Sequence, residues 1–308
     1  MLDGIKDGGQ GCSMFRLVHL SDPHLGPIPD PRPAELIGKR FAGFVNWSLR
    51  RRTSHDMALL GRIVDDIHSQ SPHHVACTGD LINISLPSEF GPAAEFMSRL
   101  GSPTFASVVP GNHDSYVSSA QPEIGKHWGP WMTTDSGRFE GFPYIRMMGP
   151  LALVGLSSGI STWPLLATGR LGRRQRDDLK AALKFLKSQG LARVILIHHP
   201  PYRGGAKPGR TLTDAAEFEA IIAETGAELI LHGHNHRTSI AYLEGPDGLV
   251  PVVGAPSASA ARGTPGHRAG YHIFDFDMTD TGVAITGHSR GLLESGEIGP
   301  IGQLRLKG

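Results

Sequence analysis

Five short polar clusters are spread along this chain of 308 residues, and each directly follows an apolar run that could form a strand. They are Asp22-Pro23-His24, Gly79-Asp80, Gly111-Asn112-His113-Asp114, His198-His199-Pro200 and Gly233-His234-Asn235-His236. This arrangement predicts that carboxylate, amide and imidazole groups from distant segments meet at one rim of a sheet. Ligands of this mixture and number suit a pair of divalent metal ions.

The spacing within the clusters supports this prediction. Residues i and i+2 of an extended chain point to the same side, so Asp22 and His24 can hold one ion together, and His234 and His236 can lie on one side of their turn. Asp80 follows a glycine, which lets the backbone bend sharply, and its two oxygens could bridge two cations. A neutral amide oxygen and a further strand-end imidazole complete the set, namely Asn112 and His198.

The segments between the clusters predict a layered α/β fold with a mixed sheet toward the C-terminus. Strand-like apolar runs cover 16–21, 74–78, 104–109, 151–157, 193–197, 228–231, 249–254, 271–276 and 283–286. Helical patterns cover 56–70, 88–100, 172–189 and 214–225, the last with Thr213 as the N-cap and Gly226 as the stop. We expect a single domain over 15–308, preceded by a disordered leader at 1–14.

Composition narrows the class of protein. The 30 Lys and Arg residues nearly balance the 29 Asp and Glu residues, so no global field attracts nucleic acid, and none is expected as a partner. The two cysteines form no disulfide framework, and Cys77 lies in an apolar run that predicts burial. With no signal-like segment and no apolar stretch of membrane-spanning length, a cytoplasmic protein is expected.

Together, the five clusters resemble the signature of the calcineurin-like metallophosphoesterase superfamily over about residues 16–290. The resemblance implies a four-layer α/β/β/α sandwich with a dinuclear metal site at the carboxyl ends of the strands. Carried over residue by residue, it implies that one ion is held by Asp22, His24 and His236. The second ion is then held by Asn112, His198 and His234, and Asp80 bridges both. His198 is preferred over His199 because the family pattern is His, any residue, Pro.

The same resemblance implies hydrolysis of a phosphate ester by hydroxide from a water held between the two ions. Asn112 and His113 would contact the substrate, His113 would protonate the leaving group, and Asp114 would orient the imidazole and keep it cationic. The ions expected are divalent Mn, Fe, Zn or Co. Asn83 stands where some relatives have a tyrosine that binds Fe(III), which disfavours a purple acid phosphatase.

For the substrate, the motifs are most similar to those of bacterial class III cyclic nucleotide phosphodiesterases, which favours a cyclic nucleotide or a related small phosphodiester. One alternative is hydrolysis of a lipid-linked pyrophosphate, as in UDP-2,3-diacylglucosamine pyrophosphatases. A non-catalytic scaffold is the alternative from another class, and the filled ligand positions disfavour it. In the loop 202–210, Arg203 and Arg210 could hold an anionic group, although an ordinary solvated loop would have the same composition.

One insertion does not fit the regular alternation of strands and helices. Residues 31–54 interleave apolar side chains with Lys39, Arg40 and the run Arg50-Arg51-Arg52, which predicts a basic amphipathic segment beside Asp22 and His24. Three roles remain open for it: a lid packed on the body, a surface that contacts lipid or an anionic membrane, or the contact of a homodimer.

Overall fold

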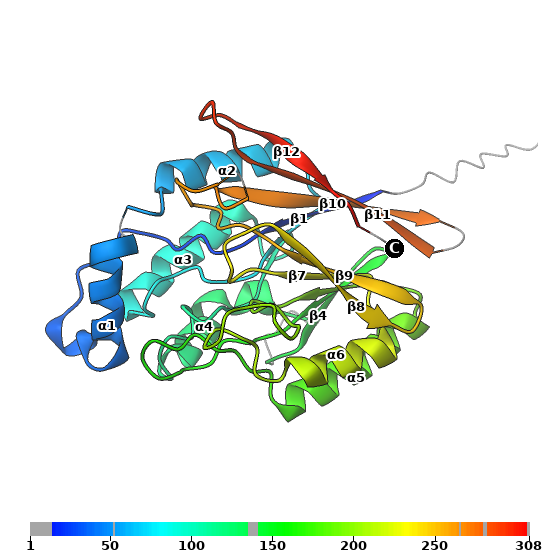
Figure 1. Ribbon diagram of the computed structural model, residues 1–308, viewed down its shortest axis with the longest axis horizontal. Helices are drawn as coiled ribbons and strands as arrows, with labels where there is room; N and C mark the ends of the chain where they lie inside the picture. Colours follow the sequence, from blue (N-terminus) through cyan, green and yellow to red (C-terminus); the bar gives the residue numbers. More distant parts are fainter. Residues whose placement is uncertain (1–13, 52, 135–140, 265, 280–281, 307–308) are drawn as a thin grey trace, which may run out of the picture.

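The computed structural model describes residues 14–51, 53–134, 141–264, 266–279 and 282–306, so the predicted leader lies outside the described residues except for Met14. Two six-stranded sheets stack face to face, and helices cover the outer face of each (Figure 1). This is the predicted four-layer α/β/β/α sandwich. It places two sheets rather than one behind the polar clusters.

The first sheet has the strand order β12-β11-β10-β1-β2-β3. Its strands are β1 (Phe15–Leu20), β2 (His74–Cys77), β3 (Ala106–Val108), β10 (Gly270–Thr279), β11 (Gly282–Leu292) and β12 (Ile298–Leu304). β1, β2 and β3 are parallel, whereas β10, β11 and β12 join antiparallel. The helices that follow β1 and β2 in the chain are α2 (Met57–Ser69) and α3 (Pro87–Leu100).

The second sheet has the order β4-β5-β6-β7-β9-β8. Its strands are β4 (Tyr144–Met148), β5 (Leu151–Gly155), β6 (Ala192–Leu196), β7 (Leu229–His232), β8 (Ser239–Gly245) and β9 (Gly248–Gly254). The four central strands are parallel and the two edge strands are antiparallel. Its outer face is covered by α5 (Arg173–Ser188) and α6 (Ala215–Thr225).

Alternate side chains of the second sheet enter different apolar clusters. Leu151 and Leu153 belong to the cluster that lies between the sheets and contains residues of both. Ala152 and Val154, on the opposite face of β5, pack with α5 and α6. Burial on both faces explains why these strands read as continuous apolar runs without a polar alternation.

The structure confirms all nine predicted strand-like runs and all four predicted helices, and it adds elements that the sequence did not reveal. The added strands β4, β8 and β12 are all at sheet edges, where one side of the strand is unpaired and polar residues interrupt the apolar pattern. The added helices are α1 (Lys39–Asn46), α4 (Ala120–Trp128) and the short turns Pro33–Leu36, Trp47–Arg51 and Gly129–Met132. Among the described residues, no helix combines the length and the apolar character that crossing a bilayer requires.

The predicted N-cap of α6 was wrong by one residue. The cap position is Asp214, not Thr213, whose hydroxyl donates to the carbonyl of Gly169 at 2.9 Å. The Asp214 carboxylate accepts the backbone N–H groups of Leu171 and Gly172 instead of capping its own helix. A tertiary contact between two loops therefore replaces the local cap that the sequence pattern indicated.

Candidate metal centre

All seven predicted ligands lie in the turns that follow the carboxyl ends of five strands, three from one sheet and two from the other. Asp22 and His24 follow β1, Asp80 follows β2, Asn112 follows β3, His198 follows β6, and His234 and His236 follow β7. Because both sheets present the same end of their parallel strands, the turns converge. The fold thus brings together residues that are up to 214 positions apart.

Asp22, His24 and His236 form the first group of the centre. The Nε2 atoms of His24 and His236 are 3.1 Å apart. The Asp22 Oδ1 atom lies 3.2 Å from the Nε2 atom of His236 and 3.9 Å from that of His24. These three side chains can face one cation.

Asn112, His198 and His234 form the second group. The Asn112 Oδ1 atom lies 3.1 Å from Nε2 of His198 and 2.8 Å from Nδ1 of His234, and these two nitrogens are 3.3 Å apart. Asp80 lies between the groups, with its Oδ2 atom 3.8 Å from Nε2 of His24 and 3.3 Å from Nε2 of His198. One carboxylate therefore reaches both groups.

The hydrogen bonds behind the rings fix which nitrogen faces the centre. The Nδ1 atom of His198 lies 2.7 Å from the carbonyl oxygen of Thr78, and that of His24 lies 3.3 Å from the carbonyl oxygen of Ile82. A carbonyl only accepts, so each Nδ1 carries a proton and each Nε2 faces the centre as the atom that can bind a cation. Within the described part of the chain, the buried Oδ1 atom of Asp22 has no hydrogen-bond partner. Lone pairs that converge without a donor fit divalent cations.

The electrostatics of the centre also favour cations. Burial lowers the pKa of His198, but the neighbouring Asp80 carboxylate outweighs burial and raises it to about 9, so a cation at Nε2 is favoured, either a proton or a metal ion that displaces it. Burial opposes ionisation of Asp80, yet the positive potential of His198 and His113 holds its pKa well below the usual value. For His24 and His234, burial lowers the pKa well below the usual value, so both rings are neutral, the form that binds metals.

Backbone conformation aims these side chains. Among the described residues, eight other than glycine have a positive φ, and five of them are predicted ligands. These five are Asp22, His24, Asp80, His234 and His236, with φ between 41° and 69°. L-residues rarely adopt this region, and such strain concentrates at functional sites. Gly111 and Gly233 allow the close approach, because a Cβ atom on them would collide with the carboxylates of Asp80 and Asp22.

His113 lies at the edge of the centre, where its position differs from the expected pairing. Its backbone N–H donates to Oδ1 of Asp80 at 2.7 Å, and its Nδ1 atom lies 2.5 Å from the carbonyl oxygen of Asn83. Its ring stacks on that of Tyr116, with centroids 5.8 Å apart. The Asn83 carbonyl and the Tyr116 ring therefore orient the imidazole.

Asp114 has a different role from the one predicted. Its carboxylate accepts the backbone N–H groups of Asp80, Gly111 and Ile82 at 2.7, 2.8 and 3.1 Å. Burial and the charge of Asp80 raise its pKa to about 7. Asp114 thus ties the Asp80 turn to the Asn112 turn and acts as a positioning residue for two ligands, rather than as the partner of the His113 imidazole.

His199 and Cys77 lie outside the cluster of ligands, as expected. The Nδ1 atom of His199 lies 2.8 Å from the Ser158 hydroxyl oxygen and its Nε2 atom lies 3.1 Å from the carbonyl of Ala167. Burial lowers the pKa of His199 to about 3, so its ring is a neutral structural group. Cys77 is fully buried.

Two hollows share His236 in their walls. The first, of about 190 Å³, is lined by Asp80, Asn112, His113, Ala167, Arg210, His234, Asn235 and His236. It includes Arg210 of the loop 202–210, whereas the Arg203 guanidinium is paired with Glu219 at 2.7 Å. The structure thus separates two arginines that the sequence treated alike.

The second hollow, of about 420 Å³, contains residues that the sequence did not single out. It is lined by Thr53, Ser54, His55, His236, Ala260, Arg262 and His267. The His55 ring lies 4.7 Å from that of His24, and its Nδ1 atom lies 2.7 Å from the Ser259 hydroxyl oxygen. The only sequence signal for His55 was its place three residues after the basic run Arg50-Arg51-Arg52, because it belongs to no strand-end cluster.

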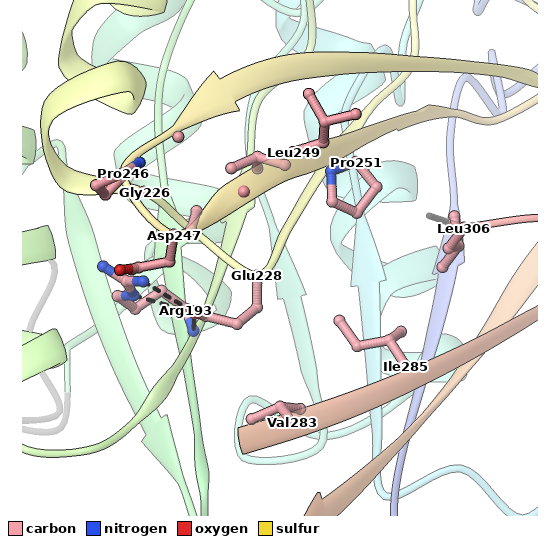
Figure 2. A pocket seen from close by; sticks show the side chains of 14 residues that line it. Arg193, Gly226, Glu228, Pro246, Asp247, Leu249, Pro251, Val283, Ile285 and Leu306 are labelled. Carbon is pink, nitrogen blue, oxygen red and sulfur yellow. Dashed lines mark hydrogen bonds and ion pairs between the residues drawn. The ribbon is translucent and has the colours of Figure 1, made fainter. Parts of the chain in front are cut away.

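A third cavity lies at the other end of the sheets, at the amino ends of β6 and β7 (Figure 2). The turn between β8 and β9 forms one wall, and Val283 and Ile285 of β11 form part of another. Of its charged residues, Arg193 and Glu228 are joined at 2.7 Å and Asp247 is paired with Lys187. None of the seven predicted ligands lines this cavity, and all seven lie at the opposite end of the sheets.

Comparisons with known proteins agree with this geometry. The family model for calcineurin-like phosphoesterases matches residues 15–238. A dimetal phosphatase from Danio rerio has a TM-score of 0.62 at 14% identity, over 94% of this chain and 99% of that one. A search of curated proteins found no match.

Two further solved structures share the fold over part of their length. A purple acid phosphatase from yellow lupin seeds has a TM-score of 0.57 at 14% identity, over 94% of this chain and 53% of that one. A sulfate thiohydrolase from Thermus thermophilus has a TM-score of 0.50 at 19% identity, over 93% of this chain and 56% of that one. The present chain spans about half the length of these two proteins, and at such identities the likeness concerns the fold.

Proposed function

Because this chain belongs to the calcineurin-like phosphoesterase family, and is thus a metal-dependent phosphoester hydrolase that uses two divalent ions, we propose that it cleaves a small phosphodiester. Cyclic nucleotides are the substrate class that we expect. The observation that carries the proposal is the convergence of carboxylate, amide and imidazole groups on one centre, next to two hollows that share His236.

In this proposal each group of ligands holds one ion. Asp22, His24 and His236 bind the first, Asn112, His198 and His234 bind the second, and Asp80 bridges them. The 3.8 Å and 3.3 Å distances from the Asp80 Oδ2 atom to the two groups support the bridging role. Bound there, two divalent ions would supply Lewis acidity, which lowers the pKa of water and offsets charge on phosphoryl oxygens.

The chain's own contribution to the leaving-group step is assigned to His113. With Nδ1 donating to the Asn83 carbonyl, Nε2 is the atom that would hold a proton and pass it to the departing oxygen. Asn112 directs its amide oxygen at the ring nitrogens of His198 and His234, so its amide nitrogen is left to donate to a phosphoryl oxygen. In the first hollow, the Arg210 guanidinium would bind a negative charge of the substrate.

The preference for a diester is inferred from the two hollows. A diester has a group on each side of phosphorus, and the hollows that share His236 could take one group each. A monoester would leave one of them filled only with water. His55 and Arg262 would then contact the second group of the diester.

A substrate panel on the Mn²⁺-loaded protein tests this proposal. We expect kcat/KM for bis(p-nitrophenyl) phosphate to exceed that for p-nitrophenyl phosphate by at least about tenfold, the discrimination that one added group in a fitted pocket provides. Cyclic nucleotides should likewise exceed the matching nucleoside monophosphates. A preference for the monoesters would overturn the diester assignment. Arg262→Ala should reduce the preference, with Arg237→Ala, outside both hollows, as the control.

A second candidate, hydrolysis of a lipid-linked pyrophosphate, is favoured by one observation. Exposed apolar side chains precede Ala167 of the first hollow in the chain, among them Trp163 and Leu166. UDP-2,3-diacylglucosamine therefore belongs in the panel. A kcat/KM for it above those of all the cyclic nucleotides would replace the leading candidate.

A further inference from the structure

We propose that this protein docks on an anionic lipid bilayer through a surface beside its metal centre, which goes beyond the hydrolytic function proposed above. The surface, named here the docking rim, combines one stripe of the segment around α1 with the loop 162–166. Its apolar members are Ile37, Phe41, Val45, Leu49, Trp163, Leu165 and Leu166, and all of them are exposed. Leu49, Trp163 and Leu165 are 78%, 81% and 97% exposed.

The segment around α1 has two apolar faces. Its inner face packs on the body, where Phe44 and Trp47 contact the small cluster of Ile28, Ile84 and Leu86. Gly43 fits against Tyr116, because a Cβ atom there would lie 2.6 Å from the tyrosine hydroxyl oxygen. A segment that served only as a lid would need this inner face and a polar outer one. The outer stripe repeats at four-residue intervals from Ile37 to Leu49, which indicates a second apolar surface to cover.

The loop 162–166 presents its apolar residues in a fixed conformation. The Thr162 hydroxyl donates to the carbonyl of Leu166 at 2.6 Å, and the Leu166 N–H donates to the carbonyl of Trp163 at 3.1 Å. Leu165 at the tip has a φ of 70°, a region that leucine rarely adopts, and its side chain is almost fully exposed. An ordered turn that holds a leucine and a tryptophan in solvent suits insertion into a bilayer interface, where tryptophan is favoured.

Lys39 joins the two parts of the rim and connects them to the centre. Its ammonium group donates to the Thr162 hydroxyl oxygen at 2.8 Å and lies 4.2 Å from the centroid of the Tyr116 ring. The Tyr116 ring also stacks on that of His113. Lys39 thus links the loop 162–166 to the segment around α1, which stands at one end of the molecule (Figure 1).

The charge of the residues near the rim favours an anionic bilayer as the partner. Three segments at or beside the rim, 36–49, 157–172 and 200–213, contain six Lys or Arg residues and no Asp or Glu, whereas the whole chain has a net charge of +1. Of these six, Arg203 is paired with Glu219 outside the segments. Basic residues around exposed apolar side chains match a bilayer that contains anionic lipids. A second copy of this chain would instead place like charges against each other, so a homodimer through this face is disfavoured.

Co-sedimentation of the full-length, metal-loaded protein with vesicles tests the proposal. We compare phosphatidylcholine vesicles with vesicles that contain about 30 mol% phosphatidylglycerol. The protein should pellet with the anionic vesicles and be released by high salt. The double variant W163S/L165S should bind at least about fivefold more weakly. F185S is the matched control, because Phe185 on α5 is also exposed, at 57%, but lies outside the rim.

Three results with vesicles would overturn the proposal: no pelleting of the wild-type protein, equal pelleting with neutral vesicles, or an equal loss in F185S. A dimer in solution that W163S/L165S dissociates would show that a second copy covers the rim instead. Both variants should unfold at the same temperature as the wild-type protein, which shows that they fold. Hydrolysis of bis(p-nitrophenyl) phosphate by the wild-type protein without vesicles separates a failure of docking from a failure of the proposed diesterase activity.

Discussion

At the metal centre, six of the seven proposed ligands are buried and five of the seven are held at positive φ, whereas on the adjoining docking rim Leu49 and Leu165 lie in solvent. The centre depends on individual atoms, since a shift of one strand register would remove a ligand from the cluster. The rim depends on composition, because many apolar and basic residues could meet a disordered lipid interface. We therefore expect the metal centre to tolerate few substitutions and the neighbouring docking rim to tolerate many.

The contrast predicts that substitutions at the centre abolish hydrolysis, whereas substitutions on the rim weaken binding to vesicles. The largest effect is expected at Asp80, whose Oδ2 atom reaches both groups of ligands. Asp80→Asn should lower kcat by about a thousandfold or more, because it weakens both ion sites together. The bound metal, measured by elemental analysis, should fall from two ions per chain. Full retention of both ions would contradict the bridging role.

The next largest effect is expected at His113, which lies between the centre and the rim. His113→Ala should lower kcat about a hundredfold or more for esters with alkoxide leaving groups, since no other group would supply the proton. The loss should be much smaller for p-nitrophenyl esters, whose leaving group departs without protonation. Metal content should stay at two per chain. An equal loss for both kinds of ester would rule out the leaving-group role.

A smaller effect is expected at Arg210, and Arg203 provides the matched control. Both arginines belong to the loop 202–210, but only Arg210 lines the first hollow, and Arg203 is paired with Glu219. Arg210→Ala should raise KM for anionic substrates about tenfold with little change in kcat. Arg203→Ala should leave both constants within about twofold, as expected for an exposed ion pair. The reverse result would place the anion contact at Arg203.

How far the sequence predicts this molecule follows from the same contrast. The ligand positions could be predicted because strand ends and residue types are both local features, and the parallel sheets then bring them together. The role of Asp114 could not, since adjacency to His113 does not reveal that its carboxylate turns to the backbone of Asp80. The edge strands β4 and β8 were missed because unpaired edges carry mixed residues. The contact of Lys39 with Thr162 joins segments 123 residues apart, so no local sequence pattern predicts it.

The smallest effect on activity is expected at Asp66, which belongs to neither region. A substitution there tests the stability of the fold alone. Its carboxylate accepts hydrogen bonds from Arg290 at 2.8 Å and from the Tyr271 hydroxyl at 2.6 Å, and so ties α2 to β10 and β11. Burial opposes ionisation of Asp66, but the bonds from Arg290 and Tyr271 outweigh it and lower the pKa of the carboxyl. Asp66→Asn should lower the free energy of unfolding by about 1–2 kcal/mol at neutral pH, with kcat/KM unchanged.

The lowered pKa of Asp66 predicts how the stability difference between the wild-type protein and Asp66→Asn changes with pH. A carboxyl with a lower pKa in the folded state stabilises the fold above its unfolded-state pKa, near 4, and loses this contribution as the pH falls through the folded-state value. The gap in Tm between the wild-type protein and Asp66→Asn should therefore be widest at neutral pH and should narrow in acid. Asp65→Asn, at the neighbouring exposed position on α2, is the control and should show no such gap. A gap that is constant from pH 7 to acid would mean that the amide disrupts packing and that the charge of Asp66 contributes nothing.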